Sequence, residues 1–171
     1  THQPDLNITN PAVRDEIHKV IGFWLELGVA GFRVDAVPFL IETVGASAED
    51  VGDPHDYLRN LRAFTSRRNG GAILLGEVNL QPEDQREFFG DEDGDELHLI
   101  LNFTINQALY LALAREEAAP LERALVALPP IAVENEWANF VRNHDELSLD
   151  KLSESERQEV FAAFGPEEGM Q

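Results

Sequence analysis

The sequence predicts an α/β fold in which short parallel strands alternate with helices, and three observations support this expectation. Apolar stretches of strand length alternate with amphipathic stretches of helix length along the chain. The segments that join successive strands are long enough for parallel crossovers. Several strands end in a carboxylate, and α/β folds usually keep their chemistry at the carboxyl ends of parallel strands.

The first half of the chain contains clear signals for helix starts and strand ends. Asn10 is a good N-cap, and Pro11 suits the first helical position. The expected elements are a helix from Pro11 that Gly28 ends, a strand over 31–35, a helix through 57–64 ending near Asn69, a strand over 72–77 and a short helix over 81–89.

The second half continues the same alternation. Ser153 and Glu156 have the spacing of a capping box, which predicts a last helix through Phe164. The other expected elements are a strand over 97–103, a helix over 106–117, a helix over 121–128 that Pro129 stops, and a fourth strand over 139–143.

Composition limits the classes of protein that the chain can represent. Its 171 residues suit one ordinary domain, and 43% of them are hydrophobic, which is enough for a sizeable core. The 32 acidic and 13 basic residues give a net charge of -19, which disfavours nucleic acid and anionic membrane surfaces as partners. We therefore expect a neutral substrate.

The sequence also bears on the cellular location of the protein and on whether the chain is part of a longer polypeptide. No cysteine is present, so neither a disulfide nor a thiolate metal site can form. No apolar run has the length of a membrane span, and the first residues do not resemble a signal peptide, so we expect a cytoplasmic protein. Because Thr1 is not a methionine, we also expect a piece of a longer polypeptide.

Three carboxylates, Asp35, Glu77 and Asp145, follow predicted strand ends, and parallel strands would bring them to one side of the molecule. Such a cluster permits metal binding, general acid/base chemistry, or retaining glycosyl transfer, in which two carboxylates lie roughly 5 Å apart. Arg33 shares a strand face with Asp35 and would keep it ionised, as a nucleophile requires. Glu77 has no cation beside it in the sequence, and neighbouring carboxylates would favour its protonated form.

Other interpretations of these carboxylates remain open at this point. Arg33 and Asp35 could form a structural ion pair that closes a buried strand. A metal-dependent α/β enzyme explains Asp35, Glu77 and Asp145 equally well on chemistry alone, but it does not explain Arg33, which would compete with a metal ion for Asp35.

Four short motifs follow one another along the chain: Q-P-D-L-N at 3–7, G-F-R-V-D at 31–35, G-E-V-N at 76–79 and F-V-R-N-H-D at 140–145. In this order they resemble the motifs that the α-amylase family, glycoside hydrolase family 13, has before the third barrel helix and at the fourth, fifth and seventh barrel strands. The resemblance covers almost the whole chain. It implies that residues 1–171 form a single partial catalytic domain, roughly strands four to seven of a (β/α)8 TIM barrel, without the upstream strands or the C-terminal β domain.

The resemblance implies a retaining enzyme that hydrolyses or transglycosylates α-glucosides such as maltose or α-glucans. Asp35 would be the nucleophile that forms a covalent glycosyl intermediate, and Glu77 the acid/base. Asp145 would hold sugar hydroxyls and favour the transition state. Arg33 and His144 would be substrate-binding residues, with Arg33 also orienting Asp35.

The branch of the family is indicated by two further stretches. A-V-P-F-L at 36–40 and N-H-D-E-L-S-L-D at 143–150 look most like the trehalose synthase branch, which isomerises maltose to trehalose. A non-catalytic carbohydrate-binding or interaction protein on the same scaffold is the alternative. The complete trio of carboxylates disfavours it.

The remaining expectations concern cofactors, partners and aromatic residues. Calcium is conceivable in the full-length enzyme, but the acidic run 91–96 lacks the spacing of a dedicated loop and is expected to be a solvated surface. A half barrel leaves sheet edges and an apolar face uncovered, so we expect the piece either to self-associate or to be part of a larger enzyme, and to be inactive alone. Trp24 and Trp137 are expected in the core, and Phe39 is a weaker candidate for a sugar subsite.

Overall fold

In a computed structural model of the chain, four parallel strands form a single sheet. The structure describes residues 6–42, 52–145, 147–167 and 169. The strands are β1 (Gly31–Val34), β2 (Ile73–Gly76), β3 (Leu99–Leu101) and β4 (Glu136–Ala138). They lie in the order β1-β2-β3-β4, so each strand pairs in parallel with the next one along the chain. This is the arrangement of consecutive strands in a (β/α)8 barrel and confirms the predicted fold class.

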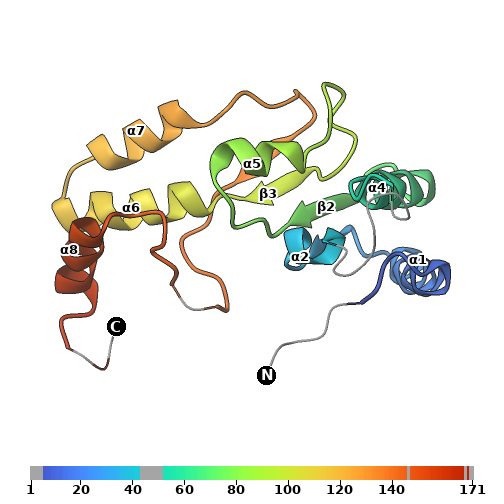
Figure 1. Cartoon of the computed structure of the whole chain (residues 1–171), viewed down its shortest axis with the longest axis horizontal. Helices are drawn as coiled ribbons and strands as arrows, with labels where there is room; N and C mark the ends of the chain where they lie inside the picture. The colour runs from blue at the N-terminus through green and yellow to red at the C-terminus, as the bar shows by residue number, and fades with distance from the viewer. Residues whose placement is uncertain (1–5, 43–51, 146, 168, 170–171) are drawn as a thin grey trace.

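Helices connect the strands and flank the sheet. They are α1 (Pro11–Glu26), α2 (Val37–Ile41), α4 (Asp56–Arg68), α5 (Pro82–Glu87), α6 (Phe103–Arg115), α7 (Ala119–Ala127) and α8 (Glu154–Phe164). The sheet lies between α1 and α4 on one side and α6, α7 and α8 on the other (Figure 1). The predicted caps are present: Asn10 accepts a hydrogen bond from the Ala12 amide, and Ser153 and Glu156 form a capping box.

The two faces of the sheet differ in what covers them. Phe32, Val34 and Leu74 belong to the main hydrophobic core, which the helices cover. Alternate residues point to the opposite face, where Ile73 is 44% exposed. Arg33 is in register with Leu75 on this second face, which we call the open face. The self-association expected of such a surface stays a prediction.

The fourth strand lies at Glu136–Ala138, so the prediction of a strand over 139–143 was wrong. The pairing ends because β3 has no further residue to offer. Leu101 pairs with Ala138, and then the Asn102 amide donates to the Ala138 carbonyl while the Asn102 side chain caps α6. Phe140 and Val141 are residue types that favour a strand, but β3 does not extend far enough to pair with them.

Two smaller differences also have local causes. Helix α6 begins at Phe103 and not at Asn106, because the Asn102 side chain accepts a hydrogen bond from the Ile105 amide. The short helix α2 was not predicted. It follows Ala36, which has a φ of 43° and turns the chain sharply out of β1.

The two tryptophans differ in their surroundings. Trp137 packs against the main core and contacts the Phe89 ring edge-on at 5.1 Å, as expected. Trp24 is 46% exposed, so its predicted place in the core was wrong. Helix α1 buries Ile21 and Leu25, and Trp24 lies on the flank of that buried stripe, against Phe23.

Candidate active site

The Arg33 guanidinium lies at the centre of a group of three carboxylates, which we call the Arg33 cluster. Its Nη1 is 2.5 Å from Asp35 Oδ1, and its Nη2 is 2.7 Å from Glu77 Oε2. Asp145 Oδ2 lies 3.9 Å from Nη2. The structure therefore brings together the three carboxylates that the sequence analysis singled out, from the ends of β1 and β2 and from the segment after β4.

Glu77 is held more firmly than the other two carboxylates. Its Oε2 accepts a hydrogen bond from the Ala36 amide at 3.2 Å, and its backbone carbonyl accepts one from the Val37 amide at 3.0 Å. Its own amide donates to the Val34 carbonyl at 3.0 Å. The turn at Ala36 therefore connects the end of β1 directly to the glutamate at the end of β2.

Glu77 was expected to have no cation beside it, and this expectation was wrong. Arg33 reaches Glu77 from the neighbouring strand, because Val34 pairs with Gly76 and the next residues on both strands meet at the same edge. Cross-strand contacts of this kind cannot be read from adjacency in the sequence. Asp35 and Glu77 thus share one guanidinium, and their roles cannot be distinguished by which of them lies beside a cation.

Asp145 is oriented by a local turn. The Asp145 amide donates to Asn143 Oδ1, and Asn143 Nδ2 donates to Asp145 Oδ2, both at 3.1 Å. His144 Nε2 lies 3.3 Å from Asp145 Oδ1. Asn143 belongs to the motif at 140–145, but the sequence analysis assigned it no function. An asparagine two residues before an aspartate is a sequence signal for such a side-chain turn.

The Arg33 cluster opens to solvent on the open face of the sheet. The Asp35 side chain is 72% exposed, whereas that of Glu77 is 18% exposed. A ligand can therefore approach Asp35 directly, with Glu77 deeper and Asp145 at the side. Two carboxylates that flank one site can act as nucleophile and acid/base in glycosyl transfer. Phe39 on α2 follows Asp35 closely in the sequence, and its side chain is exposed. Its role in a sugar subsite stays a prediction.

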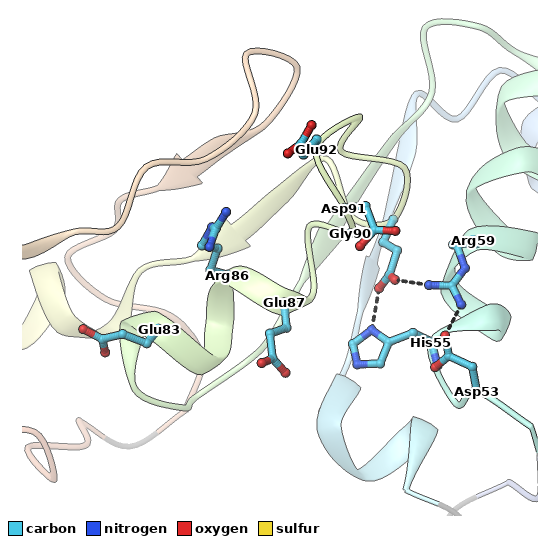
Figure 2. Close-up of a pocket in the computed structure, with 10 residues that line it drawn as sticks. Asp53, His55, Arg59, Glu83, Arg86, Glu87, Gly90, Asp91 and Glu92 are labelled. Carbon is cyan, nitrogen blue, oxygen red and sulfur yellow. Dashed lines mark hydrogen bonds and ion pairs between the residues drawn. The ribbon is translucent and has the colours of Figure 1, made fainter.

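A second polar site lies away from this cluster. It is a pocket of about 490 Å³ at the start of α4, lined also by α5 and the 90–96 loop (Figure 2). Glu96 belongs to the acidic run that was expected to be solvated, yet its side chain is 1% exposed. His55 Nδ1 donates to Glu96 Oε2 at 2.8 Å, and Arg59 Nη1 donates to Oε1 at 2.9 Å. We call these three residues the Glu96 cluster.

The Glu96 cluster does not fit a calcium site. Both carboxylate oxygens of Glu96 are already engaged by donors, and Arg59 also pairs with Asp53 and with Asp56. A cation there would have to compete with the Arg59 guanidinium. Among the described residues, no group of three or more histidine or carboxylate side chains is arranged to hold a metal ion.

Comparisons with known proteins add independent information about the chain. The family model described as the α-amylase catalytic domain matches residues 1–160. The trehalose synthase of Thermus thermophilus is 43% identical over 167 residues, which are 97% of this chain and 17% of that protein. The trehalose synthase/amylase TreS of Mycolicibacterium smegmatis is 39% identical over an alignment of 172 positions, which covers 99% of this chain and 29% of that protein.

A solved structure supports the fold. The cyclic α-maltosyl-(1→6)-maltose hydrolase of Arthrobacter globiformis superimposes with a TM-score of 0.61 at 21% identity, over 80% of this chain and 28% of that one. This chain therefore spans less than a third of the length of each relative named here. The motif at 3–7 lies mostly outside the described residues, as does Glu146. Among the described residues, no helix is long and apolar enough to cross a membrane.

Proposed function

The chain belongs to the α-amylase family, and from this premise we propose that it carries the catalytic carboxylates of a retaining enzyme that acts on α-glucosides. The observation that supports this proposal most strongly is the Arg33 cluster. Asp35, Glu77 and Asp145 come from three separate segments, and all three lie within 4 Å of one guanidinium on the open face. This convergence supports the roles that the motifs imply for the three carboxylates.

In the proposed first step, Asp35 attacks the anomeric carbon of the substrate. The bond from that carbon to the glycosidic oxygen breaks, and Glu77 gives its proton to the departing oxygen. While Glu77 carries the proton, Arg33 pairs with Asp35 and orients this nucleophile toward the anomeric carbon. The product of the step is a glycosyl ester of Asp35 and an ionised Glu77.

In the proposed second step, Glu77 takes a proton from an acceptor hydroxyl. The acceptor oxygen attacks the anomeric carbon, and Asp35 leaves as a carboxylate, which restores the starting state. Water as the acceptor gives hydrolysis, and a sugar gives transglycosylation. Asp145 and His144 would hold sugar hydroxyls beside the reacting carbon, since both are partly exposed at the edge of the cluster.

We further propose that the substrate is maltose and that the reaction is isomerisation to trehalose, ahead of hydrolysis. The support is the identity of 39–43% to proteins named trehalose synthase over nearly the whole chain. The second of these names also includes amylase, so glucose release from α-glucans is the competing outcome. The cytoplasmic location is likewise a prediction.

Proton NMR of maltose with the complete gene product that contains this sequence tests the proposal. The anomeric signals of trehalose would establish isomerisation, and glucose without trehalose would establish hydrolysis. Failure to consume maltose, trehalose or a longer α-glucan would overturn the proposed function. The same measurement on residues 1–171 alone tests the expectation that this piece is inactive.

A further inference from the structure

We propose that Asn106 and Gln107, neighbours on α6, are positioning residues that hold the segment carrying His144 and Asp145 in place for the reaction proposed above. This inference rests on the proposed function for its catalytic consequence. The two residues were not singled out by the motifs, and neither belongs to the Arg33 cluster.

Asn106 holds the first part of this segment. It is buried, and its Nδ2 donates to two successive backbone carbonyls, Phe140 at 3.0 Å and Val141 at 2.7 Å. These carbonyls follow the end of β4, where pairing with β3 has stopped. The Phe140 ring also contacts the Phe103 ring edge-on at 5.2 Å. The Asn106 side chain thus supplies the hydrogen bonds that a neighbouring strand would otherwise make to this backbone. The second of its two acceptors, Val141, lies four residues before Asp145.

Gln107 holds the far end of the same segment. It is fully buried, its Oε1 accepts from the Lys151 amide at 2.7 Å, and its Nε2 donates to Asp150 Oδ1 at 2.8 Å. Burial alone would raise the pKa of Asp150, but hydrogen bonds from Ser148, Gln107 and Lys151 lower it to about 2. Asp150 therefore stays ionised and anchored at neutral pH.

Asp145 lies between these two anchors. Its contact with Arg33, at 3.9 Å, is longer than the contacts that Asp35 and Glu77 make with the same guanidinium. The location of Asp145 is therefore set by its own segment more than by Arg33. Because α6 follows directly from β3, the anchors join this segment to the same sheet that carries Asp35 and Glu77. A displacement of about 1 Å at a catalytic group can cost about a hundredfold in rate.

The test replaces Asn106 by leucine in the complete gene product. Leucine fills similar space, but it cannot donate either of the two hydrogen bonds. Asn135→Leu is the matched control. Asn135 is also buried, and its Nδ2 donates to the Leu97 carbonyl at 2.7 Å, but it lies at the opposite end of β4. Both variants should lose thermal stability. Only Asn106→Leu should also lower kcat for maltose, by about tenfold or more, with a smaller change in KM.

Hydrogen exchange followed by mass spectrometry separates this inference from the proposed function. Amides of residues 139–145 should exchange faster in Asn106→Leu but not in Asn135→Leu, whether or not the protein acts on maltose. Unchanged exchange in this segment, or an equal loss of kcat in both variants, would overturn the inference. If Asn106→Leu does not fold, Gln107→Met takes its place, with faster exchange expected in residues 147–151 and the same loss of kcat.

Discussion

The Arg33 cluster and the Glu96 cluster both pair an arginine with a glutamate, but in opposite settings. In each, the glutamate comes from a segment far from the arginine in the sequence, Glu77 for Arg33 and Glu96 for Arg59. In the Glu96 cluster the central carboxylate is 1% exposed, and its two oxygens accept hydrogen bonds from His55 and Arg59. In the Arg33 cluster the carboxylate of Asp35 is 72% exposed on the open face.

The difference shows that the residue types in an ionic cluster do not decide what it does. A buried carboxylate whose oxygens are both engaged has little capacity left for a ligand, and it contributes mainly to the fold. A carboxylate with one cationic contact and an exposed face can still bind or attack a substrate. The two clusters should therefore respond to substitution in opposite ways.

The largest expected effect is on activity at the Arg33 cluster. Asp35→Asn in the complete gene product should lower turnover of maltose by at least about 10³-fold, because it removes the proposed nucleophile. Its thermal midpoint should change little, since the side chain is mostly exposed. Steady-state kinetics and a thermal melt check both statements. Normal turnover in this variant would remove Asp35 from the proposed mechanism.

At the Glu96 cluster we expect a smaller effect, which falls on stability and not on activity. Glu96→Gln should destabilise the fold by about 2 kcal/mol, because it leaves His55 and Arg59 without their buried anionic partner. Turnover by the folded enzyme should stay close to that of the wild type. Urea unfolding and kinetics at a low temperature would measure the two quantities. A loss of turnover without a loss of stability would contradict the contrast drawn between the clusters.

The smallest expected effect is a pH dependence that comes from His55. Its hydrogen bond to Glu96 raises the pKa of His55 above 6.5, although burial alone would lower it. A raised pKa in the folded state gives stability that is fully present below 6.5 and is lost as the pH rises through the folded value. The urea midpoint should therefore fall from pH 6.5 upward, and His55→Gln should flatten this part of the profile. If the urea midpoint changes with pH in the same way in the wild type and in His55→Gln, the His55–Glu96 pair makes no contribution to the pH dependence of stability.

The features that could be predicted from the sequence are those that depend on local periodicity. Arg33 and Asp35 share a face because they are two residues apart in a strand, and Asp35 and Glu77 meet because each directly follows one of two paired parallel strands. The capping box at Ser153 is equally local. The fold class and the membership of the Arg33 cluster therefore followed from short-range patterns and the motifs.

The features that could not be predicted depend on contacts between distant segments. The contact of Arg33 with Glu77 crosses from one strand to the next. The place where β4 ends is set by where β3 turns into α6, and the burial of Glu96 is set by His55 and Arg59, about 40 residues earlier in the chain. The hydrogen-bond partners of Asn106 could not be predicted either, because no sequence pattern indicates which distant backbone groups a buried asparagine in a helix contacts.

The order of the strands has a consequence for how such a protein can diversify. Because β1, β2, β3 and β4 neighbour one another in chain order, each carboxylate of the Arg33 cluster is delivered by a different strand-and-helix unit. Mutations that lengthen or reshape the loop after one strand can alter the surroundings of the Arg33 cluster while the other units keep their carboxylates in register. For the proposed reaction, natural selection can thus change the preferred acceptor one loop at a time without replacing the carboxylates.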